Sequence, residues 1–167
     1  MFKRKILSKL EAWKQEERHK PLILRGARQV GKTTVVNEFG SQFDNYLYFN
    51  LEMSESVRLF EMDIPLNDLV IMLFASLGKS QKEGSTLIFI DEIQNSPKTI
   101  ALLRYFYEQR PDLYVIAAGS LLENLVDVNV SFPVGRVMYL ALRPCSFYEF
   151  FRCHRQKQSS YHSLTES

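Results

Sequence analysis

The stretch LILRGARQVGKTT, residues 22–34, decides how this chain folds. Its apolar run at 22–24 has the composition of a short buried strand and stops at Gly26, and residues 33–39 then have the pattern of a helix closed by Gly40. Between strand and helix, residues 26–33 match G-x-x-x-x-G-K-[ST] at every fixed position. Such a match arises by accident in roughly one chain of this length in a hundred, and the flanking strand and helix make accident rarer still.

This loop pattern predicts a site for Mg²⁺ and the phosphates of ATP. Gly26 and Gly31 let the backbone curl until successive N–H groups converge on the phosphates, and the next helix adds its positive N-terminal dipole end. We expect Lys32 to reach the β and γ phosphates and Thr33 to ligate Mg²⁺ through its hydroxyl. Arg28 occupies a variable position of the motif, and a solvated residue at the tip of the loop is as good an interpretation as a nucleotide-binding residue. The expected nucleotide-binding residues are Gly26, Ala27, Arg28, Gln29, Val30, Gly31, Lys32, Thr33 and Thr34.

A second motif follows the apolar run TLIFID at 86–91, where Asp91 and Glu92 stand together. This is the Walker B arrangement, in which Asp91 at the strand end would hold Mg²⁺, usually through water, and Glu92 would polarise the attacking water as a general base. Two acids after a strand often form a mere solvated loop. Their distance from the phosphate loop allows one intervening strand and helix, and this spacing favours the functional interpretation.

Three further polar residues have two interpretations each. Ser120, at the end of the apolar run LYVIAAGS (113–120), is a candidate sensor of the γ-phosphate or a simple helix cap. Gln94 either orients water or hydrogen-bonds the turn that follows Glu92. Arg136 precedes the last apolar run and is either an arginine finger that reaches a neighbouring subunit's γ-phosphate or a surface arginine.

The rest of the chain predicts one α/β domain with a five-stranded parallel sheet covered by helices on both faces, a P-loop NTPase fold. The other strands are expected at 46–52, 113–120 and 137–142, and the helices at 3–18, at 97 onward and at 121–127. Ser96 and Pro97 form a strong helix start. We divide the chain into an amphipathic N-terminal helix (1–20), an ATPase core (21–151) and a polar, disordered tail (152–167).

Composition narrows the class of protein. With 167 residues and 46% hydrophobic residues, one sizeable core is expected. The net charge of +2 is too small to indicate nucleic-acid binding. Seven Lys and Arg among residues 1–20 would attract phosphate backbones, but such a run is more often a solvated face. Cys145 and Cys153 lack zinc-site spacing, and neither a signal peptide nor a membrane span is evident, so a reducing cytoplasm is expected.

Several motifs together resemble those of a known family, the bacterial and archaeal AAA-like ATPases that join a P-loop domain to a C-terminal domain with a restriction-nuclease-like fold. They are GARQVGKTT (26–34), FIDEIQ (89–94), AAGSLL (117–122), GR (135–136) and LRPCSFYEF (142–150). The resemblance covers nearly all of residues 3–151. It implies phosphate and Mg²⁺ roles for Lys32, Thr33, Asp91 and Glu92. Members of this family usually continue into a further domain. Cys145 stands at a position where a small or aliphatic residue is more usual in the family.

Other functions are less well supported by the sequence. A GTPase would need an Asn-Lys-x-Asp motif and an ABC-type ATPase a Ser-Gly-Gly signature, and neither occurs. A small-molecule kinase would need an arginine-rich lid, whereas segments 53–68 and 128–135 contain Arg58 alone. An ATP-binding switch without useful turnover stays open beside the ATPase.

An aromatic cluster ends the expected core. Phe147, Tyr148, Phe150 and Phe151 either pack back on the core or form a docking surface for a further domain. An uncovered cluster would favour self-association. Regular assembly in this class often depends on the further region, and we expect weak or absent oligomers for this chain.

Overall fold

A parallel five-stranded sheet forms the centre of the molecule in the computed structural model, which describes residues 5–120 and 132–143. The strands are β1 (Leu22–Arg25), β2 (Asn45–Asn50), β3 (Thr86–Asp91), β4 (Leu113–Gly119) and β5 (Met138–Ala141). Their spatial order is β2-β3-β4-β1-β5, with every neighbouring pair parallel. The order places β4 between β3 and β1, the strands that lead into the two sequence motifs.

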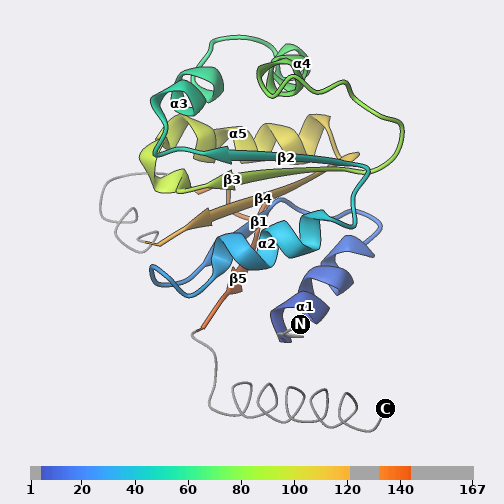
Figure 1. Cartoon of the computed structure of the whole chain (residues 1–167), viewed down its shortest axis with the longest axis vertical. Coiled ribbons are helices and arrows are strands. Elements are labelled where there is room, and N and C mark those ends of the chain that lie inside the picture. Colours follow the sequence, from blue (N-terminus) through green and yellow to red (C-terminus); the bar gives the residue numbers. More distant parts are fainter. Residues whose placement is uncertain (1–4, 121–131, 144–167) are drawn as a thin grey trace, which may run out of the picture.

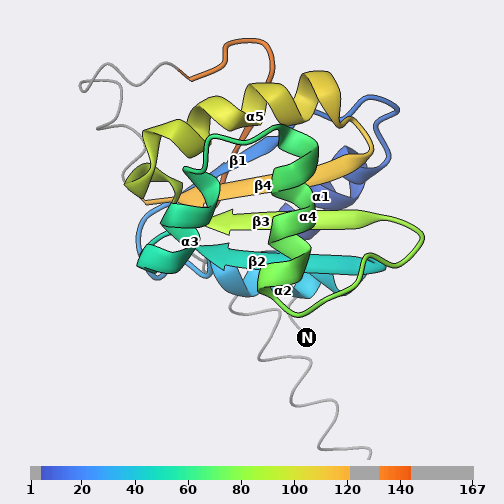
Figure 2. The same cartoon turned by 90° about the horizontal axis from the view of Figure 1, so that it is seen from above.

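Helices cover both faces of the sheet, because its strands are apolar on both sides (Figure 1). One face carries α1 (Lys5–Lys14) and α2 (Lys32–Gly40), and the other carries α3 (Ser54–Phe60), α4 (Leu66–Ser76) and α5 (Pro97–Gln109). Figure 2 shows α3, α4 and α5 lying over β2, β3 and β4. All six residues of β3 are buried, as expected for a strand between two helical layers. The predicted α/β fold class is confirmed.

The first helix is shorter than the sequence predicted. The helix was expected over 3–18, but α1 ends at Lys14, and the next residues form turns. Trp13 donates its indole N–H to the carbonyl of Lys20 over 2.7 Å, and the ring of His19 stacks on Tyr114 with centroids 3.8 Å apart. These contacts hold the chain that follows α1 against β4, so they compete with continuation of the helix.

The connection from β2 to β3 also differs from expectation. It contains the two helices α3 and α4, whereas no helix was predicted between the strands at 46–52 and 86–91. Pro65 stands immediately before α4 with φ −56° and ψ 147°. Since a proline provides no backbone N–H and disfavours helical geometry in the residue before it, the chain breaks here and starts a second helix.

Most expected boundaries lie within two residues of the observed ones. The run 86–91 is β3 without any change, and the expected start of α5 is confirmed: Pro97 is its first residue, and the Ser96 hydroxyl accepts a hydrogen bond from the Thr99 N–H. The expected helix at 121–127, Cys145, Cys153, the aromatic cluster at 147–151 and the tail at 152–167 lie outside the described residues. Within the described residues, no helix is long and apolar enough to cross a membrane.

Candidate functional site

The carboxyl ends of β1, β3 and β4 meet at one edge of the sheet and carry the predicted functional residues. Residues 26–31 follow β1, Glu92 follows β3, whose last residue is Asp91, and Ser120 follows β4. Because the strands are parallel and adjacent, segments far apart in sequence come together there. Arg136 does not belong to this group, since it precedes β5 and therefore lies toward the opposite edge.

The loop between β1 and α2 has the backbone bends that a phosphate-binding loop requires. Gly31 caps α2 in the left-handed region with φ 87°, and Gln29 also has a positive φ of 62°. Val30 turns into the core between β1 and the α1–α2 layer, and it anchors the loop from within. Ala27, Arg28 and Gln29 are exposed at the loop tip, and Thr34 is exposed on α2.

Gly26 is required for a different reason. A side chain at this position would place its Cβ 2.6 Å from the carbonyl oxygen of Leu142 and 3.0 Å from Val30 Cγ2. Leu142 in turn donates its N–H to the carbonyl of Arg25 over 2.7 Å. Close backbone contact with the chain that leaves β5, and not a positive φ, excludes larger residues here.

Lys32, the first residue of α2, is 6% exposed. Its ammonium donates to the carbonyls of Gly26 (2.7 Å) and Ala27 (2.8 Å), which holds the charge inside the loop. Burial lowers the pKa of Lys32 below its ordinary value, and the negative charges of Glu92 and Asp91 oppose that shift. The lysine therefore stands within the field of both acids at the site.

Asp91 and Thr33 join the two motifs directly. The Thr33 hydroxyl donates to Asp91 Oδ2 over 2.6 Å, and Asp91 is 4% exposed. The other carboxylate oxygen accepts the backbone N–H of Glu92 over 3.0 Å. A hydroxyl and a carboxylate side by side are the hard oxygen ligands that Mg²⁺ prefers, usually completed by water and substrate phosphates.

Tyr48, on β2, is a site residue that the sequence reasoning missed. Its hydroxyl lies 3.4 Å from Asp91 Oδ2, and burial, followed by the charge of Asp91, raises its pKa to about 12. From Tyr46 onward, the sequence NYLYFN alternates tyrosine or asparagine with apolar residues, and residues two apart lie on the same face of a strand. Tyr48 pairs with Phe89 of β3, the strand that ends in Asp91. The alternation was therefore a signal for a second residue near that acid.

Glu92 and Ser120 occupy unusual positions at the same edge. Glu92 has a left-handed backbone, with φ 55° and ψ 44°, a conformation that non-glycine residues adopt only under constraint. Its carboxylate accepts a hydrogen bond from the Gln94 side-chain amide. The hydroxyl of Ser120 is buried without a hydrogen-bond partner within the described parts of the chain, which is unusual for a polar group unless a ligand or water completes it.

Arg136 forms an ion pair instead of standing free. Its Nε donates to Glu108 Oε1 of α5 over 2.7 Å, and Arg104 donates to the same oxygen over 3.0 Å. These two hydrogen bonds hold the pKa of Glu108 below its ordinary value, and the bond from Arg136 has the larger effect. Arg136 therefore cannot serve the nucleotide site of its own chain in this arrangement.

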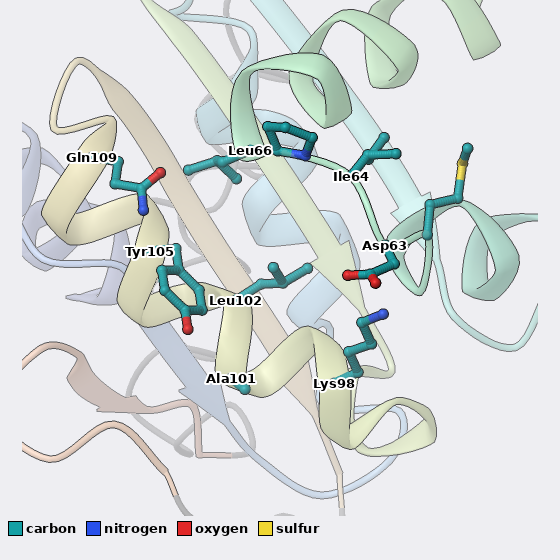
Figure 3. Close-up of a pocket in the computed structure, with 10 residues that line it drawn as sticks. Asp63, Ile64, Leu66, Lys98, Ala101, Leu102, Tyr105 and Gln109 are labelled. Atoms are coloured by element: carbon teal, nitrogen blue, oxygen red, sulfur yellow. The ribbon is translucent and has the colours of Figure 1, made fainter.

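A separate cavity of about 490 Å³ lies between the segment that connects α3 with α4 and the outer face of α5 (Figure 3). Figure 3 shows Asp63 and Lys98 near one end and Gln109 near the other, with Leu102 and Tyr105 between them. No residue of the phosphate loop lines it.

The residues present fit a nucleotide with its magnesium ion. The loop provides a buried ammonium and the N-terminus of α2, the Thr33–Asp91 pair provides oxygen ligands, and Ser120 provides an unpaired polar atom. In residues 5–120 and 132–143 there is no cluster of three His, Cys, Asp or Glu side chains that would hold a metal through protein ligands alone. Mg²⁺ that arrives with phosphates needs no such cluster.

Comparison with known proteins agrees with the geometry. A solved structure of the Aeropyrum pernix ORC1 protein in complex with DNA is similar, with a TM-score of 0.56 and 16% identity over 94% of this chain. This chain spans 48% of that one, and at such low identity the likeness shows the fold alone. A search of curated proteins found no match. The family model described as "AAA domain" matches residues 18–151, and the chain therefore belongs to this AAA domain family.

Proposed function

We propose that this chain binds Mg²⁺-ATP at the edge formed by the loop at 26–33 and the acids after β3, and that it hydrolyses the bound ATP. The observation that carries the proposal is the 2.6 Å hydrogen bond from Thr33 to Asp91, which joins the two motifs beside the buried Lys32. The family supports nucleotide binding, and the donor set supports magnesium.

Each residue has a distinct role in the proposed reaction. Lys32 would exchange its two loop carbonyls for the β and γ phosphates, whose charge compensates its burial. Thr33 would ligate Mg²⁺ directly, and Asp91 would hold the ion through water. Glu92 would take a proton from the attacking water, and Ser120 would hydrogen-bond the γ-phosphate.

The experiment measures binding and turnover separately. Lys32→Ala should abolish or severely weaken Mg²⁺-ATP binding in a calorimetric titration, while Lys9→Ala, which removes an exposed lysine of α1, should bind like the parent. Glu92→Gln should keep the parent affinity and lose about 10² to 10⁴ in hydrolysis rate, with Glu11→Gln as the matched surface control. Parent-like affinity of Lys32→Ala would refute the binding site.

A switch that binds ATP without useful turnover is the alternative. Parent protein that binds Mg²⁺-ATP, yet releases phosphate no faster than Glu92→Gln, would establish the switch. In longer relatives, the resemblance implies that the nucleotide cycle drives or regulates a C-terminal domain.

Arg136 has a proposed role only between subunits. If it supplies a neighbouring site, it must leave Glu108, and turnover should rise more steeply than linearly with protein concentration. A mixture of Arg136→Ala and Lys32→Ala chains should then recover some activity, because each supplies what the other lacks. Linear turnover without recovery would leave Arg136 with its ion pair alone.

A further inference from the structure

Gln94 lies in the short 3-10 turn η1 (Ile93–Asn95), which begins directly after Glu92. Its side-chain nitrogen donates to Glu92 Oε2. The opposite orientation of the amide would place two acceptor oxygens against each other, so the chemistry selects this one. The hydrogen bond fixes the carboxylate of a residue whose backbone is already held in the left-handed region.

The amide oxygen of Gln94 is buried and has no hydrogen-bond partner among residues 5–120 and 132–143. Leaving a buried acceptor unpaired is costly, and in native proteins such an atom usually has a water, ion or ligand as its partner. One half of the amide is therefore committed to Glu92, and the other half is available.

A second unpaired polar atom lies at the same edge. In the register of β3 and β4, Ile90 pairs with Ala117. Gln94 follows Ile90 by a few residues, and Ser120 follows Ala117 by a few residues, so both lie just beyond the same edge of the sheet. The turn η1 packs against β4. The Ser120 hydroxyl is buried and also lacks a partner within the described residues.

These groups lie where hydrolysis would occur. Glu92 donates its backbone N–H to Asp91, and the other carboxylate oxygen of Asp91 accepts the hydroxyl of Thr33 at the end of the phosphate loop, so Glu92 follows directly on the contact between the two motifs. A water that attacks a γ-phosphate needs one acceptor for the proton it loses and a second acceptor that fixes its direction. Glu92 offers the first acceptor and the free oxygen of Gln94 the second.

We propose that Gln94 is a positioning residue for the attacking water: its amide N–H holds Glu92, and its amide oxygen accepts a hydrogen bond from the same water. The inference rests on the proposed function. In the step, the water oxygen forms a bond to the γ-phosphorus, and the bond from that phosphorus to the β–γ bridging oxygen breaks. The electron pair leaves with ADP, and the water proton passes to Glu92.

The test uses the full chain and Gln94→Met, which keeps the length of the side chain and removes both polar atoms. Mg²⁺-ATP and Mg²⁺-ADP affinities should stay within about twofold of the parent, while hydrolysis falls ~10- to 100-fold. Gln109→Met, which changes an exposed glutamine of α5, should match the parent throughout.

A second measurement does not depend on turnover. Mg²⁺-ADP with aluminium fluoride mimics the phosphoryl group in flight and holds a water at the attacking position, so its affinity relative to Mg²⁺-ADP reports on that water. We expect Gln94→Met to weaken this relative affinity about tenfold. Combining Gln94→Met with Glu92→Gln should add little further loss, because both residues act on one water.

The outcomes separate the two proposals. A parent chain that fails to bind Mg²⁺-ATP overturns both. Suppose instead that the parent binds ATP while Gln94→Met keeps the parent turnover and the parent ratio of aluminium fluoride complex affinity to Mg²⁺-ADP affinity. That result overturns only the role of Gln94. Should Gln94→Met fail to fold, Gln94→Glu keeps the shape while removing the amide donor, and parent-like fluoride affinity in that variant overturns the inference.

Discussion

Replacing Gly26 with alanine tests whether close packing with the chain after β5 shapes the phosphate loop. The new Cβ would lie 2.6 Å from the Leu142 carbonyl oxygen, whereas ordinary contacts begin at 3.4 Å, so the two backbones must move apart by about 0.8 Å. That movement strains the hydrogen bond from the Leu142 N–H to the Arg25 carbonyl.

The magnitude follows from these two contacts. Overpacking a close contact costs typically about 1–3 kcal/mol, and a strained backbone hydrogen bond adds about 1 kcal/mol. We therefore expect Gly26→Ala to lower the free energy of unfolding by about 2–4 kcal/mol. Affinity for Mg²⁺-ATP should fall as well, because the Gly26 carbonyl and its neighbours shape the loop around Lys32.

Urea denaturation followed by circular dichroism is the assay, and Gly78→Ala is the control. Gly78 has a φ of 62°, but a methyl group added there would have no neighbouring atom within 4 Å, so its replacement carries only the backbone penalty of about 1–2 kcal/mol. If Gly26→Ala costs no more than about 0.5 kcal/mol, Leu142 does not restrict this position and the packing explanation is wrong.

Three other predictions concern magnesium, the start of α5 and the Arg136 ion pair. Asp91→Asn should remove most of the gain in ATP affinity that Mg²⁺ provides, about tenfold or more, in titrations with and without the ion. Ser96→Ala should cost about 1–2 kcal/mol in urea denaturation because the cap to Thr99 is lost, whereas Ser41→Ala, an exposed site, should change stability by less than about 0.5 kcal/mol. The lowered pKa of Glu108 means that its ionised form contributes stability above the ordinary value of 4.5, and this contribution disappears as the pH falls through the lower value in the folded chain. The stability difference between the parent and Glu108→Gln should therefore shrink below about pH 4.5; a constant difference would show that Arg136 gains nothing from this carboxylate.

The sequence predicted the sheet and the positions of its strands because each strand is a short apolar run ended by a polar or glycine residue. Thr86–Asp91 was predicted without error for this reason. The loop at 26–33 was predicted equally well, because phosphate binding requires glycines and a lysine at set positions of the motif.

Other features depended on contacts that no local pattern reveals. The early end of α1 depends on His19 and Trp13 meeting Tyr114, a residue of a distant strand. The partner of Arg136 is on α5, and the unpaired oxygen of Gln94 becomes evident only when its surroundings are known. Tertiary contacts of this kind determine whether a polar side chain has a hydrogen-bond or ion-pair partner, whereas periodicity in the sequence predicts only the helix or strand that carries it.

The strand order has a consequence for the way in which this chain folds. β1 is synthesised before the other strands of this sheet, yet its neighbours are β4 and β5, with Leu22 opposite both Ile116 and Met138. β2, β3 and β4 can pair in the order in which they emerge, but β1 stays unpaired until β4 has been synthesised. Pairing between such distant segments is slow because a long loop must close first. Residues 22–24 therefore stay unpaired during this interval, and exposed apolar segments of this kind make a growing chain prone to aggregation.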